Sequence, residues 1–211
     1  MKINARQLNL YAVTDRSWLE PGETLVAVTE ELLKAGVTCV QLREKHMSDE
    51  EILTEASLLK DLCDRYQVPL IINDRPDLAK KVGASGVHVG LSDMGIQKAR
   101  KLLGEDFIIG GSAHNVEEAL AAEAAGADYL GCGAVFGSTT KTNVTQLPVE
   151  TLKAICKAVK IPVVAIGGVN SDNLPLLAGS GIAGAAVVSG LFKPTDKAAA
   201  VRRFLSQLKA I

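Results

Sequence analysis

Short apolar segments alternate with longer amphipathic segments along the whole chain. The apolar segments, such as residues 162–166, are continuous runs of hydrophobic and β-branched residues without a regular alternation of polar positions. Strands of this kind are buried on both faces, as in a parallel sheet that helices cover. The pattern predicts strands at 8–14, 37–43, 69–73, 86–90, 107–112, 129–135, 162–167 and 184–189. It predicts helices at 23–35, 49–67, 77–83, 95–103, 116–125, 149–159, 172–179 and 196–209.

Residues at the ends of the predicted helices agree with this order of elements. A glycine follows the last turn of several helices, where it adopts the left-handed conformation that ends a helix. These glycines are Gly36, Gly83, Gly126 and Gly179. At helix starts, Ser48 begins a capping box, and Asn115 and Ser171 are candidate N-caps.

Eight strands and eight helices in alternation predict an α/β fold, a small (β/α)8 TIM barrel that forms one compact domain over residues 1–211. A doubly wound open sheet is the alternative. A dinucleotide-binding sheet of that kind carries a glycine fingerprint after its first strand, whereas residues 13–16 of this chain contain no glycine.

The composition narrows the class of function. Charged residues make up 22% of the chain and the net charge is −1, so the basic surface typical of proteins that bind nucleic acid or acidic membranes is missing. The uncharged segment 173–192 is long enough to span a membrane, but its glycines and Pro175 divide it into a short helix and a strand. The N-terminal residues show no signal-peptide pattern. We therefore expect a cytoplasmic protein, in which Cys39, Cys63, Cys132 and Cys156 are reduced thiols in or near the core.

Three polar residues end the second predicted strand. Gln41, Arg43 and Lys45 alternate to the same side of an extended chain. Polar groups on a core strand are costly unless they line a polar cavity, such as one that holds an anion. The alternative is that the strand has already ended and that Arg43 and Lys45 are solvated.

Carboxylates follow the next two strands. Asp74 comes directly after Asn73 at the end of the third strand, and Asp93 follows the fourth. Neighbouring strands lie about 4.8 Å apart, so these two carboxylates can converge at the mouth of a barrel. Such a pair suits Mg²⁺, which also binds substrate phosphate oxygens. An ion pair between Asp74 and Arg75, or an N-cap role for Asp93, is the alternative.

The later strand ends carry glycines and hydroxyls. Gly168 follows the seventh strand and Ser189 ends the eighth, which is the usual place of a phosphate site in such barrels. Segment 137–143, with its hydroxyls and one lysine, is predicted to be a mobile lid that binds an anion, with an ordinary polar loop as the alternative. The strand ends therefore predict two anion subsites.

Three polar side chains remain near the fourth and fifth strands. Ser112 could reach a ligand, His114 is predicted to be a loop histidine, and His88 a hydrogen-bonded core histidine.

Several short motifs occur in a fixed order along the chain. They are QLREK at 41–45, INDR at 72–75, GVHVG at 86–90 followed by Asp93, GADY at 126–129, TK at 140–141 and AIGG at 165–168. Together they resemble the thiamine phosphate synthase family, and the resemblance extends from about Tyr11 to Phe192.

The resemblance implies a transferase of thiamine biosynthesis. The family condenses 4-amino-2-methyl-5-(diphosphooxymethyl)pyrimidine with 4-methyl-5-(2-phosphoethyl)thiazole to thiamine monophosphate and releases pyrophosphate. The implied mechanism is dissociative: pyrophosphate leaves first, assisted by one Mg²⁺ per site. The expected partners are these phosphorylated small molecules, without nucleic acid or membrane, and the sequence leaves open whether the chain forms a homo-oligomer.

The resemblance also implies roles for residues of this chain. The pyrimidine diphosphate contacts would be Gln41, Arg43, Lys45, Asn73, Ser112 and Lys141, with Leu42 and Glu44 as further substrate contacts. The thiazole phosphate contacts would be Ser138, Thr139, Thr140, Gly168, Val188 and Ser189. Arg43, Lys45 and Lys141 would be the catalytic cations, and Asp74 and Asp93 the Mg²⁺ ligands. The family often has threonine where Ser138 stands and Gln-Glu where Leu91 and Ser92 stand.

Two other functions stay open at this point. Related barrels isomerise the thiazole phosphate with a histidine after the fifth strand, where His114 stands. A phosphate-binding protein without catalytic activity is the third hypothesis. Neither needs the full set of cations and carboxylates that this chain carries.

Overall fold

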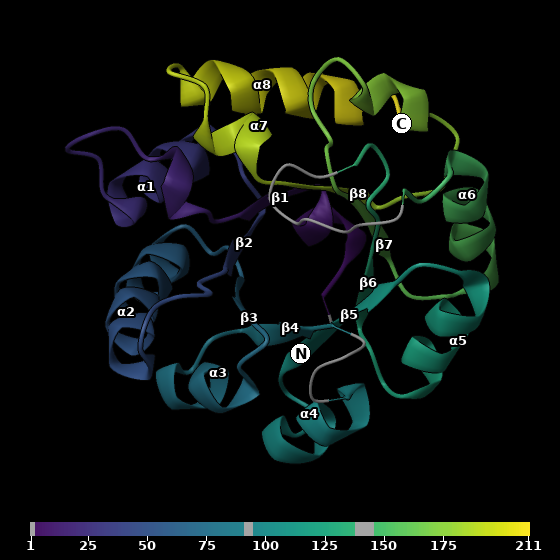
Figure 1. Cartoon of the computed structure of the whole chain (residues 1–211), viewed down its shortest axis with the longest axis horizontal. Helices are drawn as coiled ribbons and strands as arrows, with labels where there is room; N and C mark the ends of the chain where they lie inside the picture. The colour runs from purple at the N-terminus through teal and green to yellow at the C-terminus, as the bar shows by residue number, and fades with distance from the viewer. Residues whose placement is uncertain (1–2, 91–94, 138–145) are drawn as a thin grey trace.

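Eight parallel strands close into a barrel in the computed structural model, which describes residues 3–90, 95–137 and 146–211 (Figure 1). Each strand pairs with its sequence neighbours, and β8 closes the barrel by pairing with β1. The strands are β1 (Leu10–Val13), β2 (Cys39–Leu42), β3 (Leu70–Asn73), β4 (Gly86–Val89), β5 (Ile108–Ala113), β6 (Tyr129–Cys132), β7 (Val163–Ile166) and β8 (Gly184–Val187). The predicted TIM barrel is confirmed, and its strands are mostly shorter than predicted.

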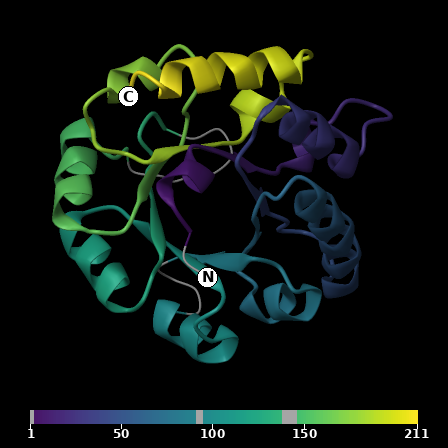
Figure 2. The same cartoon turned by 180° about the vertical axis from the view of Figure 1, so that it is seen from behind.

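Helices surround the barrel in a ring, and the N-terminal segment lies across the end seen in Figure 2. The α-helices are α1 (Leu25–Ala35), α2 (Asp49–Arg65), α3 (Pro76–Val82), α4 (Ile96–Leu103), α5 (Val116–Ala124), α6 (Val149–Ala158), α7 (Ser189–Phe192) and α8 (Lys197–Leu208). Short 3₁₀ helices are η1 (Ala5–Leu8), η2 (Arg16–Trp18) and η3 (Leu174–Leu177).

Two predictions near the C-terminus are wrong in detail. The helix predicted at 172–179 is the 3₁₀ turn η3, because Pro175 stands in its first turn and Ala178 is extended. The turn before η3 is stabilised by Asn170 and not by the predicted N-cap Ser171. The Asn170 side-chain oxygen accepts hydrogen bonds from the backbone N–H groups of residues 172 and 173. The eighth strand ends at Val187, and α7 begins where it was predicted to continue.

The other helix-end signals are confirmed. Gly36 and Gly83 are C-caps with φ of 116° and 67°, a conformation that glycine adopts without steric cost. Ser48 and Glu51 form the predicted capping box at the start of α2. Asn115 accepts a hydrogen bond from the Glu118 N–H at the start of α5.

The barrel has two hydrophobic layers. The larger layer lies between strands and helices and contains, for example, Leu42, Leu59 and Ile72. The smaller layer fills the inside of the barrel, where Tyr11 and Tyr129 are the largest side chains. Inward-facing side chains therefore close the barrel as a packed core rather than a pore.

The inner layer makes Gly110→Ala a strongly destabilising substitution. A Cβ at Gly110 would overlap the ring of Tyr129, which is fully buried and hydrogen-bonded to Tyr11. Overpacking of this kind costs about 3 kcal/mol of unfolding free energy. At Gly111 the one close approach of a Cβ would be to the flexible end of Ile96, so Gly111→Ala should cost about 1 kcal/mol or less. Urea unfolding of both variants checks this, and equal losses would contradict it.

The cysteines are reduced, and three of them are fully buried: Cys39, Cys63 and Cys132. Burial raises the pKa of Cys63 to about 12 and that of Cys132 to about 12. Burial also raises the pKa of the half-buried Cys156 to about 11. The predicted assignment as core or near-core thiols is thus confirmed.

These raised thiol pKa values make stability fall at alkaline pH. In the unfolded chain the thiols ionise near the ordinary value of 9.0, whereas folded Cys63 and Cys132 stay neutral up to about 12. Their contribution is complete below about pH 9 and is lost as pH rises towards 12, by up to about 1.4 kcal/mol per pH unit for each thiol. Urea unfolding between pH 8 and 10.5 should show this slope, and a Cys63→Ala/Cys132→Ala variant should show a shallower one. Equal slopes in the wild type and the double variant would contradict raised pKa values for these two thiols.

Among the described residues, no helix is long and apolar enough to cross a membrane. The uncharged segment 173–192 divides into η3, β8 and α7.

Candidate active site at the barrel mouth

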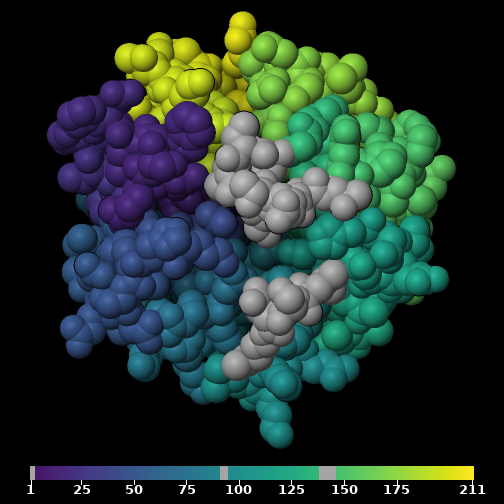
Figure 3. Space-filling view, viewed as in Figure 1, coloured from purple at the N-terminus to yellow at the C-terminus, as the bar shows by residue number. Residues whose placement is uncertain are grey.

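The C-terminal ends of the strands meet at the end of the barrel that faces the viewer in Figures 1 and 3. The space-filling view of this end is hollowed near its centre (Figure 3). In enzymes with this fold the active site lies at this end, because the loops after the strands converge there.

The end of β2 supplies an amide and two cations. Gln41 is buried and points into the barrel, where its Nε2 donates to the Tyr11 hydroxyl at 2.7 Å. Arg43 is half-buried, and its backbone N–H donates to Thr14 Oγ1 at 2.9 Å. Lys45 is exposed and reaches across to the end of β3.

Two other residues of this segment face away from the mouth. Leu42 packs in the outer layer, so only its backbone is available to a substrate. The Glu44 side chain is 6% exposed and accepts from Arg16 Nε at 3.0 Å. Arg16 also pairs with Glu55 of α2, so Glu44 helps to hold the β2 end against that helix.

Asp74 stands at the centre of the polar cluster. Its Oδ2 accepts from Lys45 Nζ at 2.6 Å and from Asn73 Nδ2 at 2.6 Å. Its backbone N–H donates to the His88 carbonyl at 2.8 Å. Asp74 has φ of +59°, a conformation that non-glycine residues rarely adopt and that occurs preferentially at functional sites. The turn therefore directs this carboxylate towards Lys45.

Arg75 has a structural role next to this carboxylate. Its guanidinium donates to both oxygens of Asp49 at 2.6 Å, and it also pairs with Asp77 at 3.0 Å. The pKa of Asp49 and that of Asp77 are both lowered, chiefly by hydrogen bonds from Arg75. Arg75 thus ties the end of β3 to the start of α2, and the alternative of an Asp74–Arg75 pair is not what the structure shows.

The ends of β4 and β5 bring His88 and Ser112 together. His88 Nε2 lies 3.2 Å from Ser112 Oγ, and His88 Nδ1 lies 3.1 Å from the Tyr129 hydroxyl. His88 is hydrogen-bonded, as the sequence predicts, but it is half-buried rather than a core residue. His114 lies on the surface, 3.0 Å from a Glu118 oxygen, as expected of a loop histidine.

At the ends of β7 and β8 the backbone is closely packed at Gly168 and starts a short helix after Val187. Gly168 has φ of +65°, and a Cβ there would lie 2.5 Å from the Phe136 carbonyl oxygen, so only glycine fits. Val188 and Ser189 stand at the start of the short helix α7. Loops after the seventh and eighth strands and a short extra helix often bind phosphate in TIM barrels.

The remaining predicted site residues lie outside the part of the chain that the structure describes. They are Asp93, Ser138, Thr139, Thr140 and Lys141. Within the described ranges 3–90, 95–137 and 146–211, no group of three or more histidine, cysteine, aspartate or glutamate side chains could hold a metal ion. Asp74 is a described carboxylate at the barrel mouth and therefore a candidate cation ligand.

Sequence reasoning missed Tyr11 and Tyr129, which join Gln41 to His88 inside the barrel. Nothing in the sequence distinguishes them from ordinary core aromatics. The signal that could have found Tyr129 is Gly110 on the neighbouring strand, because an interior glycine in a strand often makes room for a large group.

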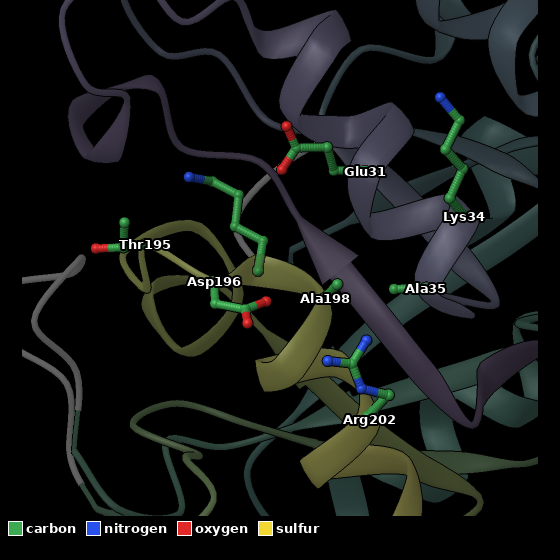
Figure 4. Close-up of a pocket in the computed structure, with 8 residues that line it drawn as sticks. Glu31, Lys34, Ala35, Thr195, Asp196, Ala198 and Arg202 are labelled. Atoms are coloured by element: carbon green, nitrogen blue, oxygen red, sulfur yellow. The ribbon is translucent and has the colours of Figure 1, made fainter.

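A second hollow, of about 600 Å³, lies between α1 and α8 (Figure 4). It is lined by Glu31 and Lys34 of α1, by Arg202 of α8 and by Asp196, the N-cap of α8. Its charges are of both signs, and the nearly buried Lys197 is already paired with Glu23 at 2.9 Å. We therefore place the candidate site at the strand ends.

Comparison with known proteins points to one family. Residues 10–191 match the family described as thiamine monophosphate synthase. "Thiamine-phosphate synthase 2" of Streptococcus pneumoniae serotype 4 is 46% identical over 209 residues, 99% of each chain. "Thiamine-phosphate synthase" of Clostridium acetobutylicum is 49% identical over 192 residues, 90% of each chain.

Solved structures give the same result. A thiamine phosphate pyrophosphorylase from Pyrococcus furiosus superimposes with a TM-score of 0.89 at 36% identity, over 97% of each chain. A 3-hexulose-6-phosphate synthase shares the fold alone, with a TM-score of 0.71 at 17% identity, over 95% of this chain and 99% of that one. The chain belongs to the thiamine monophosphate synthase family of transferases.

Proposed function

We propose that this enzyme transfers the pyrimidine methyl group of 4-amino-2-methyl-5-(diphosphooxymethyl)pyrimidine to the nitrogen of 4-methyl-5-(2-phosphoethyl)thiazole, forming thiamine monophosphate and pyrophosphate. The observation that carries the proposal is the cluster of Lys45, Asn73 and Asp74 at the mouth. Arg43 lies at the same end of β2 as Lys45. This arrangement of ammonium, amide and carboxylate suits a diphosphate with its metal ion.

The proposed reaction breaks one bond and forms one. The bond between the methylene carbon and the diphosphate oxygen breaks, and its electron pair leaves with pyrophosphate. The resulting pyrimidine methyl cation accepts the lone pair of the thiazole nitrogen. Because no proton needs to be removed, the residues act mainly by stabilising negative charge on the leaving group. Arg43 and Lys45, and Lys141 by its position in the family motif, would supply the positive charge that stabilises the leaving pyrophosphate.

Mg²⁺ fits the oxygen donors of this site. Asp74 is a carboxylate held close to a cation, and with Asp93 it would provide the pair of hard ligands that Mg²⁺ prefers. The bound ion would supply further positive charge to the diphosphate oxygens. Lys45 would then exchange Asp74 for the diphosphate as its partner.

The thiazole phosphate would be seated on the opposite side of the mouth. The tight glycine turn at Gly168 and the start of α7 at Val188 and Ser189 offer backbone N–H groups to a monophosphate. By the family motif, the hydroxyls of Ser138, Thr139 and Thr140 would complete this subsite.

Metal removal and a histidine variant together test the proposal against the isomerase hypothesis. A chelator should abolish formation of thiamine phosphate, and added Mg²⁺ should restore it. His114→Ala should keep near-normal activity, because its side chain is engaged by Glu118 at the surface. Activity that is unaffected by the chelator and is lost in His114→Ala would contradict the proposal.

A further inference from the structure

Five polar side chains form a continuous hydrogen-bonded chain across the inside of the barrel. Gln41 Nε2 lies 2.7 Å from the Tyr11 hydroxyl, which lies 2.9 Å from the Tyr129 hydroxyl. The Tyr129 hydroxyl lies 3.1 Å from His88 Nδ1, and His88 Nε2 lies 3.2 Å from Ser112 Oγ. The chain thus connects a predicted substrate contact on β2 with another on β5.

The barrel is built to hold the rings of this chain in place. Tyr11 and Tyr129 are 1% and 0% exposed. Glycines make the room: a Cβ at Gly110 would overlap the Tyr129 ring, and one at Gly131 would lie 3.1 Å from His88 Cε1. Buried hydroxyls cost free energy unless they are paired, whereas phenylalanine would fill most of the same space. The hydroxyls therefore serve orientation more than packing.

The donor and acceptor properties of these groups determine which group donates each hydrogen bond of the series. The Gln41 amide nitrogen can only donate, so the Tyr11 oxygen accepts there. Burial raises the pKa of Tyr11 well above its usual value, so its hydroxyl keeps its proton. Its proton can go to the Tyr129 oxygen or to the neighbouring Cys39 thiol, and sulfur is the weaker acceptor.

The same reasoning applies to the remaining hydrogen bonds, from Tyr129 to Ser112. The Tyr129 hydroxyl, which accepts from Tyr11, donates to His88 Nδ1. His88 therefore carries its proton on Nε2 and donates it to Ser112 Oγ. With that oxygen accepting from the imidazole, the Ser112 hydroxyl proton is available to a group in the barrel mouth.

We propose that Tyr129 and His88 are positioning residues: they hold the Ser112 hydroxyl so that it donates a hydrogen bond to the bound pyrimidine diphosphate. This inference rests on the proposed function. Neither ring needs to touch the substrate, because each acts through the next group in the chain.

Tyr129→Phe tests the positioning role. It keeps the ring but removes the link between Tyr11 and His88, and kcat/KM for the pyrimidine diphosphate should fall about 10-fold. The KM for the thiazole phosphate should change less than about twofold. Tyr66→Phe is the matched control: it removes a tyrosine hydroxyl bonded to Glu30 at 3.1 Å on the outside of the barrel, and activity should stay at the wild-type level.

A double variant and a spectroscopic measurement separate positioning from structural support. Because Tyr129 acts through Ser112, Tyr129→Phe/Ser112→Ala should be no slower than Ser112→Ala alone. Nitrogen-15 NMR of the ligand-free wild-type protein should show His88 protonated on Nε2, and Tyr129→Phe should change that tautomer balance.

The outcomes distinguish this inference from the proposed function. An active wild-type enzyme with additive variant effects, or with His88 protonated on Nδ1, would overturn the positioning role alone. A wild-type protein that forms no thiamine phosphate would overturn the proposed function, and the role of Ser112 towards the diphosphate with it.

Discussion

Asp74→Asn should lower kcat about 100- to 1000-fold while the protein remains folded. We propose this carboxylate as an Mg²⁺ ligand, and loss of a single electrostatic group in a preorganised site has effects of this size. Asparagine tolerates the left-handed conformation that Asp74 adopts, so backbone strain does not add to the effect. An alanine variant would combine both effects and be harder to interpret.

Asp64→Asn is the matched control for this substitution. Asp64 also pairs with a lysine, Lys60, but on the outer surface of α2. Its replacement should leave kcat within about twofold of wild type, because exposed ion pairs contribute little. Steady-state assays at saturating Mg²⁺, with circular dichroism melting curves for each variant, are the measurement. An Asp74→Asn enzyme within tenfold of wild type would contradict the metal role.

Lys45→Met should lower kcat/KM for the pyrimidine diphosphate about 100-fold. Methionine keeps most of the side-chain volume but removes the ammonium that we expect to bind the leaving group. The KM for the thiazole phosphate should remain near its wild-type value, because that substrate is expected on the opposite side of the mouth. Lys60→Met, which breaks the outer Lys60–Asp64 pair, is the control and should leave kcat/KM for the pyrimidine diphosphate unchanged.

The same variant separates metal binding from substrate binding. The Lys45 ammonium lies 2.6 Å from Asp74 Oδ2, so it would compete with a cation for that carboxylate. Lys45→Met should therefore bind Mg²⁺ or Mn²⁺ at least as tightly as wild type when substrates are absent, although its turnover is impaired. Isothermal titration with Mn²⁺ is the test. Loss of cation affinity in Lys45→Met would contradict an exchange of partners at Asp74.

The strands and most helices could be predicted because their signals are local. Buried parallel strands read as apolar runs, and glycine ends helices wherever a left-handed residue is required, as at Gly36 and Gly83. The prediction at 172–179 is wrong because an apolar segment with Pro175 and nearby glycines can bury Leu174 and Leu177 in a single 3₁₀ turn as well as in a helix.

The candidate site could be predicted only in part, because partners come from distant strands. The polar strand ends revealed Lys45 and Asp74, but not that they would pair with each other. Glu44 is predicted as a substrate contact, whereas its side chain pairs with Arg16 of η2, a partner that is distant in the sequence. The two inner tyrosines resembled core residues until the neighbouring strands placed their hydroxyls together.

The direct test of the proposed function is to quantify thiamine phosphate and pyrophosphate together by mass spectrometry. The wild-type protein is incubated with Mg²⁺ and with each substrate alone or with both. We expect the two products in equal amounts when both substrates are present, and no thiamine phosphate with either substrate alone. No thiamine phosphate from both substrates, even with enzyme present in an amount equal to substrate, would contradict the assignment.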